Sequence, residues 1–423
     1  ATIAGLSNGF ILPFLKQINM EVTRSYFAIC LSEALFIIFL ATMGIAWGLG
    51  FDKINDRRIL MFIALEFAAL FIFLTSTAWT LIEYLAYRLM TGFFISAVYA
   101  FTMSIVADMY RPGERINTFL LIYLFMNIGA GIGSAIAIGL SQFMNWRKIV
   151  AIYACILSIG SGFVFLLSEP RNSEAVGEKQ ALASTSKHGY FSEGGDMKRV
   201  ISVNTNRIII IQGFFGCVPW GAIGLLLIYA LMEKTGAGFV TMGGIIVIAG
   251  ALYPLSLLVS PLVDRLRSEN KYSTLTNIAG VAVITQAVLF FIALSIPLPR
   301  VENKSTSDVA SQLYCILSLI KSHAVIIMII TYGVFICVAS IVGPITRNII
   351  ADVNEPRDRA TALTIIRVFE NSGNAVGLII SGILVDMYGS FLLPLKIIWV
   401  FWIVCALLWF VMGKYYEEDI LDG

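Results

Sequence analysis

Long apolar runs separated by short polar turns dominate this chain. A helix needs about 20 apolar residues to cross a bilayer, and eleven runs approach or exceed that length. They cover residues 25–50, 59–81, 82–108, 116–143, 148–167, 207–232, 238–263, 273–296, 324–351, 360–386 and 391–413. We interpret a shorter run over residues 1–15 as the end of a further span that starts before residue 1. The pattern therefore predicts twelve transmembrane helices.

The longest polar segment divides these helices into two sets of six. Residues 169–206 are rich in Ser, Gly, Lys and Glu, a composition typical of a linker. We expect a six-helix half over residues 1–168, a cytoplasmic linker over 169–206, a second six-helix half over 207–413 and a cytoplasmic tail over 414–423. A further polar stretch, residues 297–322, is expected to form a loop.

One stretch of the first half recurs in the second half, 244 positions later. It reads IVADMYRPGERINTFLLIYLFMNIGAGIG from Ile105 and IIADVNEPRDRATALTIIRVFENSGNAVG from Ile349. Both copies contain an Asp-x6-Arg turn followed by Asn-x-Gly-x3-Gly. A repeat of this size at one offset predicts two homologous halves that run parallel in the membrane.

Composition agrees with an integral membrane protein and excludes several other classes. Hydrophobic residues make up 58% of the chain and charged residues only 13%, whereas soluble domains are about a quarter charged. The net charge of +2 and the lack of a basic cluster give no reason to expect nucleic acid. The two His residues lie far apart, and no nucleotide-binding Gly-x4-Gly-Lys loop occurs. We therefore expect no enzyme activity, no metal and no cofactor, and a monomer surrounded by membrane lipids.

Lys and Arg residues predict the orientation, because cytoplasmic loops carry an excess of them. Most of those in loops fall on the side that holds the linker and both copies of the repeated turn. That side is expected to be cytoplasmic, together with both termini, in a plasma or endolysosomal membrane.

Charged residues inside membrane spans are costly and usually face a cavity or each other. Glu33 and Arg88 lie in two spans of the first half that could bring them together. Arg88 would then hold an anionic head group while Glu33 takes a proton, or the two would form a structural ion pair. The residues by themselves leave both interpretations open.

A second polar group lies in one span of the other half. Arg367, Glu370 and Asn371 have i, i+3 and i+4 spacing, so they share a helix face. We expect this face to be the main substrate or coupling site, with a structural ion pair as the alternative. The equivalent face of the first half carries no charge, and its Asn127 is a further candidate. Arg347, near a span end, is expected to reach the interface.

Three more residues are candidates to line the site. Gln212 lies in a span with several Gly residues and a Pro, which predicts a bendable helix. Trp220 and Tyr332 could wall an amphipathic cavity, although aromatic side chains in spans are more often packed or lipid-facing. Gly373 and Gly377 of the repeat predict close helix packing, with a hinge as the alternative.

The repeated turns carry charges that could latch the cytoplasmic ends of the helices. Arg115 opens a helix, where a carboxylate is normally favoured over a cation, so we expect it to pair with an acid. The alternative is a set of solvated charges with near-zero pair energies. Recurrence in both halves favours the latch, whose candidate residues are Asp52, Arg57, Arg58, Asp108, Arg115, Asp264, Arg265, Asp352 and Arg359.

The loop after the second span carries a family resemblance. It reads GLGFDKINDRR from Gly48, and it resembles the Gly-x3-Asp-Arg/Lys-x-Gly-Arg-Arg loop of the major facilitator superfamily, with Asn55 or Asp56 in place of the motif's second Gly. A weaker copy, SPLVDR, follows the eighth span, and Arg88-x3-Gly92 is similar to another family pattern. The resemblance covers the whole chain and implies the all-α fold of this superfamily, with twelve transmembrane helices in two halves.

Other residues look most like the Spinster-related members of that superfamily. They are the Asp-x6-Arg turn, Trp146-Arg147 and Pro219-Trp220. The resemblance implies export of sphingolipids or lysophospholipids. That group usually carries an acidic residue in its first span, whereas residues 1–15 contain none.

These observations together predict a secondary active transporter that works by alternating access. Its substrate would be amphipathic, like a lysophospholipid or sphingolipid, or a small organic molecule, with protons as the candidate coupling ion. One alternative is a transporter of a small polar metabolite or drug. An alternative of another class is a non-transporting receptor or scaffold on the same fold.

Overall fold

The computed structural model describes residues 12–53, 56–109, 129, 132–133, 136–137, 139–141, 143–166, 197–252, 272–301, 309–355 and 358–421. Within these ranges the chain is helical and contains no strand, which confirms the predicted all-α class. Nine of the described segments are long and apolar enough to cross a membrane, and each matches a predicted span. They are Tyr26–Gly44, Arg57–Thr77, Leu81–Thr102, Trp146–Leu166, Asn204–Thr235, Tyr272–Ser295, His323–Val353, Thr361–Tyr388 and Leu392–Ile420.

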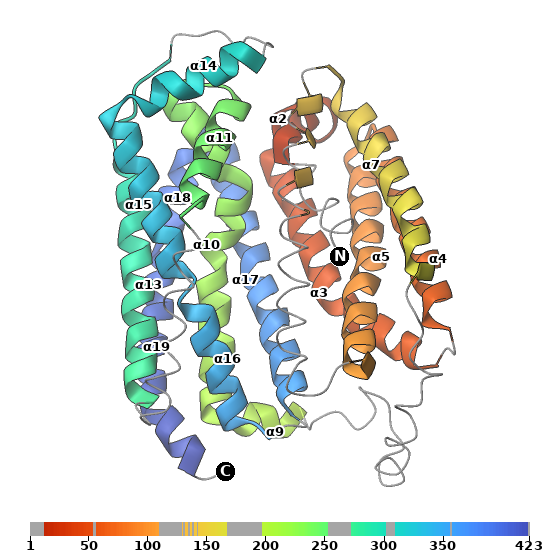
Figure 1. The fold of residues 1–423 in the computed structure, drawn as a ribbon, viewed down its shortest axis with the longest axis vertical. Helices are drawn as coiled ribbons and strands as arrows, with labels where there is room; N and C mark the ends of the chain where they lie inside the picture. Colours follow the sequence, from red (N-terminus) through yellow and green to blue (C-terminus); the bar gives the residue numbers. More distant parts are fainter. Residues whose placement is uncertain are drawn as a thin grey trace. The chain divides into compact units, whose positions relative to one another are not determined.

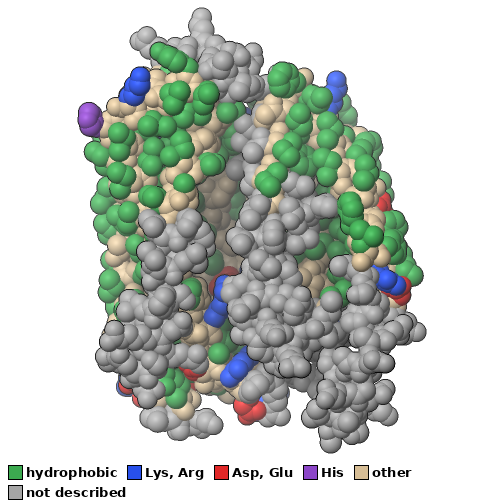
Figure 2. All heavy atoms as spheres, viewed as in Figure 1, with side chains coloured by type: hydrophobic (Ala, Val, Ile, Leu, Met, Phe, Trp, Pro, Cys, Tyr) green, Lys and Arg blue, Asp and Glu red, His purple; other side chains and the backbone are tan. Residues whose placement is uncertain are grey.

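Side-chain chemistry on the described surface fits a bilayer. On the face drawn in Figure 2, hydrophobic side chains cover most of the described surface, and charged side chains lie mostly toward the helix ends. Such a surface would be unusual in water, where large exposed apolar patches promote association.

The chain forms two compact units, residues 1–194 and 195–423. In the first, α3 and α4 both pack on α5, and α4 also packs on α7 (Figure 1). Its described elements are η1 (Leu12–Phe14), α2 (Leu15–Ile18), η2 (Asn19–Thr23), α3 (Tyr26–Lys53), α4 (Arg57–Thr77), α5 (Leu81–Met109), α7 (Trp146–Ser161) and η3 (Gly162–Leu166). The predicted span over residues 116–143 lies mostly outside the described residues.

The two ends of α4 show how polar side chains complete the helices of the first unit. At its start, Asp56 accepts hydrogen bonds from the backbone N–H of Arg58 at 3.0 Å and from the Arg58 Nε at 2.9 Å. These bonds, the side-chain one foremost, hold the pKa of Asp56 below its usual range. At its other end, Arg147 donates to the carbonyl oxygens of Ser76 and Ala78 at 2.9 and 2.7 Å. Both charges suit the helix dipole.

The second unit is built around the long helix α10. In Figure 1 the long helices of this unit run side by side, while α9 and α14 lie across opposite ends. α10 packs along α17 and α19, and α13 packs on α15 and α19. The elements are α9 (Met197–Ser202), α10 (Asn204–Thr235), α11 (Phe239–Gly250), α13 (Tyr272–Ser295), α14 (Val309–Ile320), α15 (His323–Ala339), α16 (Val342–Val353), α17 (Arg359–Tyr388), α18 (Leu392–Ile398) and α19 (Val400–Leu421).

Two neighbouring residues at the end of α10 complete the ends of other helices. Glu233 accepts the backbone N–H of Phe391 at 2.7 Å, just before α18 begins. Lys234 donates Nζ–H to the carbonyl oxygens of Leu294 and Ile296, at 2.7 and 2.6 Å, where α13 ends. An anion at a helix start and a cation at a helix end both stabilise unpaired backbone groups.

Three segments differ from the sequence-based expectation. The polar stretch 297–322 contains the helix α14, whose Cys315 and Leu319 are buried. Residues 197–202, inside the expected linker, form α9. The expected tail continues α19 as far as Leu421, and there the Asp419 carboxylate accepts the backbone N–H of Thr205 at 2.7 Å. In each case a tertiary contact orders residues whose local composition suggests a loop.

The predicted span over residues 324–351 is broken into α15 and α16. The break falls at Ser340 and Ile341. Pro344 follows four residues after Ser340, and a proline ring clashes with the carbonyl group of the residue four positions earlier. The proline therefore accounts for the position of the break.

Candidate functional site

Glu370, on the polar face of α17, lies against α10. Gly213 of α10 leaves room for Glu370, since a Cβ atom built at Gly213 would lie 3.3 Å from the Glu370 Cγ. Glu370 is partly exposed and Arg367 is exposed. Asn371 donates its amide N–H to the Arg367 carbonyl oxygen at 2.8 Å, so this amide is turned back onto its own helix.

A second arginine joins this group from another helix. Arg347 of α16 is close enough for its charge, like that of Arg367, to act on the Glu370 carboxylate. Glu370 is eleven residues along α17, about 16 Å from its start at 1.5 Å per residue. Arg347 itself is exposed and lies six residues before Val353, the last residue of α16. The expectation that Arg347 reaches the interface stays a prediction, and its exposed position near the end of α16 is compatible with it.

Gln212 lies beside this group and is held by a neighbouring helix. Its side-chain oxygen accepts the Cys405 thiol of α19 at 3.3 Å, and Gln212 is buried. One turn further on, the Gly216 carbonyl oxygen accepts the Trp402 Nε1–H at 2.9 Å. α19 therefore fixes the turn of α10 that faces Glu370.

The two aromatic candidates pack with other rings. Trp220 stacks on Phe335 with ring centroids 5.5 Å apart and meets Trp402 edge-on at 5.7 Å. Tyr332 lies 5.2 Å from Phe335. This arrangement favours the packed interpretation of both residues over the wall of a substrate cavity.

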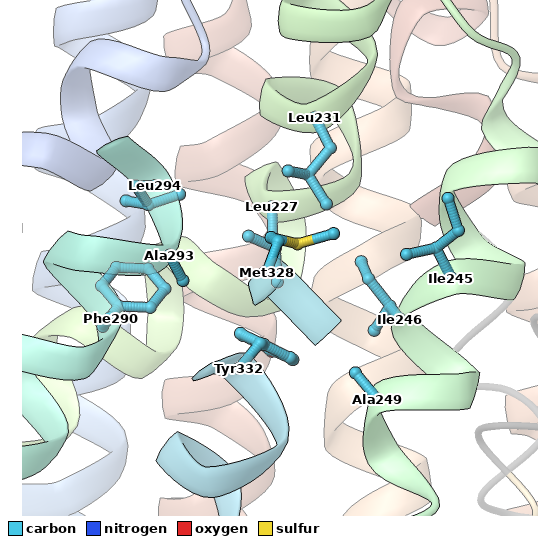
Figure 3. A pocket seen from close by; sticks show the side chains of 10 residues that line it. All are labelled: Leu227, Leu231, Ile245, Ile246, Ala249, Phe290, Ala293, Leu294, Met328 and Tyr332. Atoms are coloured by element: carbon cyan, nitrogen blue, oxygen red, sulfur yellow. The ribbon is translucent and has the colours of Figure 1, made fainter. Parts of the chain in front are cut away.

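Tyr332 also lines a small cavity among α10, α11, α13 and α15. Figure 3 shows ten side chains around it, all of them aliphatic or aromatic except Met328. Its volume of about 10 Å³ is close to what one water molecule needs. The cavity is therefore too small for an organic substrate.

Glu33 and Arg88 form a buried ion pair in the first unit. The Arg88 Nε donates to Glu33 Oε1 at 3.0 Å, and Nη2 donates to Oε2 at 2.6 Å. The guanidinium also lies 4.3 Å from the centre of the Phe36 ring. The Arg88 side chain is 1% exposed and the Glu33 side chain is 13% exposed, so each charge is balanced mainly by the other. Asn127 lies outside the described residues.

Part of the predicted latch falls within the described residues. Arg57 is buried, and Arg58 pairs with Asp56, two residues before it. In the second unit, Asp352 accepts the Tyr416 hydroxyl at 2.7 Å, and Arg359 donates to the Asn354 carbonyl oxygen at 3.1 Å. The side chains of Asp52, Asp108, Arg115, Asp264 and Arg265 lie outside the described part of the chain.

The second turn is held by residues that the sequence analysis did not single out. Asn206 and Asn354 exchange side-chain amide hydrogen bonds at 2.8 and 3.0 Å. Arg199 of α9 pairs with Glu355 at 3.0 Å and with the buried carboxylate of Asp358. Asn206 and Asn354 could not be identified as partners from the sequence, because Asn is also common in loops.

In the first unit, a similar set of contacts lies where α4 ends and α7 begins. The Arg147 guanidinium lies 4.2 Å from the Trp79 ring and 4.6 Å from the Trp146 ring. Glu21 of η2 accepts the Trp146 Nε1–H at 2.9 Å. Among the described residues, no group of three His, Cys, Asp or Glu side chains could hold a metal ion.

Comparison with known proteins identifies the fold. A family model described as the Major Facilitator Superfamily matches residues 1–303. No curated protein matches the chain in sequence. Two crystal structures of a bacterial homologue of the human lysosomal transporter Spinster, both inward-facing, cover 99% of this chain and 95% of their own. The occupied form has a TM-score of 0.67 at 13% identity, and the unoccupied form 0.68 at 14%. The nucleoside transporter NupG covers 99% of this chain and 96% of its own, with a TM-score of 0.65 at 14% identity.

Proposed function

We propose that this chain, which belongs to the Major Facilitator Superfamily, is a secondary active transporter that works by alternating access between its two halves. The family match and the fold shared with solved transporter structures support this proposal. The substrate, the coupling ion and the orientation are our proposals, and they rest on the charged groups of the spans.

The group of Arg347, Arg367 and Glu370 is the observation that supports this proposal most strongly. A charge inside a membrane span is costly and is usually retained for a substrate or ion pathway. The guanidinium groups of Arg347 and Arg367 favour a substrate with an anionic or zwitterionic head, because a guanidinium can bind a carboxylate or phosphate through two parallel hydrogen bonds. A single-chain amphiphile such as a lysophospholipid meets this requirement, and so does a small organic anion.

Glu370 is the proposed coupling residue. A carboxylate near cationic groups can take up a proton when the substrate's own anion replaces it beside those groups. Protonation of Glu370 would release positive charge for the substrate, so substrate and proton would be coupled. Glu33 and Arg88 already bind each other through two hydrogen bonds, and we assign this pair a structural role.

We further propose that the linker and both repeated turns lie on the cytoplasmic side, where the turns stabilise one state of the transport cycle. The Asp352–Tyr416 and Arg359–Asn354 contacts support this role for the second turn. Asp108→Ala or Asp352→Ala should then shift the balance between inward- and outward-open states. Unchanged accessibility of state-specific cysteine labels would contradict the latch.

The first experiment identifies a ligand with purified protein. Thermal shift with a panel of single-chain lysophospholipids and small polar solutes should show stabilisation by members that carry an anionic group. Stabilisation by neutral polar solutes alone would favour the alternative of a polar-metabolite transporter.

The second experiment measures flux of that ligand into liposomes, with and without a pH gradient. Glu370→Gln should abolish the response to the gradient, while Glu418→Gln, at an exposed position near the chain end, should not. If Glu370→Gln transports normally with the same pH dependence, Glu370 is only structural. Binding without flux in the parental protein would favour the receptor or scaffold alternative.

A further inference from the structure

Helix α14 exposes an apolar face although its opposite face is already buried. Cys315 and Leu319 are only 8% and 3% exposed, whereas Leu313, Tyr314 and Leu317 are 56%, 71% and 54% exposed. Leu313 and Leu317 are four residues apart and therefore lie on the same side of the helix. A helix that is apolar on both sides is stable only where both sides are covered. The exposed side of α14 therefore requires a partner.

The contact between α14 and α11 fixes where α14 lies along α11. The Ile316 side chain lies over Gly244, and a Cβ atom built at Gly244 would be 2.9 Å from the Ile316 Cδ1. Gly244 is five residues into α11, about 8 Å along that helix at 1.5 Å per residue. α14 therefore lies across the helix ends, close to them, as Figure 1 shows.

The exposed face of α14 continues into a surface that faces lipid. Two residues, Lys321 and Ser322, separate the end of α14 from His323, where α15 begins as a membrane span. Ile326, Ile327 and Ile330 of that span are 39%, 53% and 53% exposed. The connecting Lys321 is exposed as well, which places a cation where the lipid phosphates of a bilayer would lie.

We propose that α14 is an interfacial helix, and that its Leu313, Tyr314 and Leu317 side chains insert into the phospholipid leaflet at this end of the molecule. Interfacial helices bury their apolar face about 5–10 Å into the boundary between head groups and acyl chains. Tyr314 suits this boundary because its ring is apolar and its hydroxyl is polar. Lys321 binds lipid phosphate.

Such docking gives the segment between α13 and α15 a fixed depth in the membrane. α14 packs on α11 and α15, so the leaflet would hold the ends of both helices through it. This inference does not depend on the proposed substrate or coupling.

Spin labels in liposomes of neutral and anionic phospholipid test the proposal directly. Leu313→Cys and Leu317→Cys each place a label on the exposed face, and Lys321→Cys provides the control at the head-group level. Labelling of the six native cysteines is measured on the parental chain and subtracted. Collision rates with oxygen, which dissolves in acyl chains, and with a water-soluble nickel chelate report the surroundings of each label.

We expect high oxygen and low nickel collision rates at both leucine positions, and the opposite at Lys321. High nickel collision rates at both leucine positions would overturn the proposal, because the face would then lie in water. Label–label broadening that disappears on dilution with unlabelled protein would also overturn it, since a second copy of the chain would then cover the face. Two independent leucine positions keep the test valid if one variant fails to fold.

Discussion

Gly377 of α17 lies directly against the carbonyl oxygen of Val218 on α10, and a methyl group added at Gly377 would overlap that oxygen. The same relationship joins Gly373 to the Phe214 carbonyl oxygen and Gly221 to the Asn374 carbonyl oxygen. The two helix backbones are therefore in direct contact over two turns. This contact explains the Gly-x3-Gly part of the repeat in the second half by close packing.

Gly377→Ala should destabilise the protein, because neither backbone can move away without separating α10 from α17. Overpacking of this kind costs about 1–3 kcal/mol, which thermal unfolding of the purified protein can measure. Gly224→Ala is the matched control on α10, since nothing lies within 4 Å of a Cβ atom built there. Equal melting temperatures for the two variants would show that the contact can relax.

Arg88→Met should destabilise the first unit strongly, because it leaves the Glu33 carboxylate without its cation. Removing one partner of a buried pair costs about 3–5 kcal/mol, whereas replacing both partners by apolar residues is often neutral. The double variant Arg88→Met with Glu33→Met should therefore recover most of the melting temperature. If the stable double variant has lost transport, the pair does more than hold the fold.

Arg199→Met should loosen α9 from the repeated turn of the second unit. It leaves the Asp358 side chain, 4% exposed, without its cation, at a cost of about 1–3 kcal/mol. Lys414→Met removes the same charge from an exposed position on α19 and should have little effect. Cysteine labelling of residues in α9 should increase in the first variant only, and equal labelling in both would argue against the contact.

Asp56→Ala should cost about 1 kcal/mol by removing the N-terminal cap of α4. Because folding lowers the pKa of Asp56, its stabilising effect is complete above the unfolded pKa of about 3.9 and is lost as the pH falls through the lower, folded value. The melting temperatures of parent and variant should therefore differ at pH 5–8 and converge below about pH 4. Asp56→Asn keeps a capping oxygen and should lie between the two.

Most of the membrane-spanning architecture could be predicted from the sequence. Each of the nine described membrane-length segments lies where an apolar run predicts one, because crossing hydrocarbon requires a long apolar segment that satisfies its own backbone hydrogen bonds. The same local rule placed Arg367 and Glu370 on one face of α17. It did not place Arg347 with them, since α16 reaches Glu370 only through the packing of the second unit.

The loops were predicted less well, and α9 and α14 show why. Residues 197–202 are too few for hydrophobic periodicity to identify a helix. Residues 309–320 lie within a stretch whose polar residues suggest a loop. α9 exists because Arg199 and Asn206 find partners in the repeated turn. α14 is held in place because Ile316 packs over Gly244 and Leu319 is buried.

Sequence by itself thus determined which segments of this protein span the membrane, the duplication of its two halves and the family to which it belongs. These properties follow from apolar length and from repeated local motifs. Tertiary structure alone decided that Arg347 joins Glu370, that Arg88 is neutralised by Glu33, that the repeated glycines bring two backbones into contact and that α14 presents an apolar face. Each of these depends on which helix lies opposite, and that is a property of packing between segments far apart in the chain.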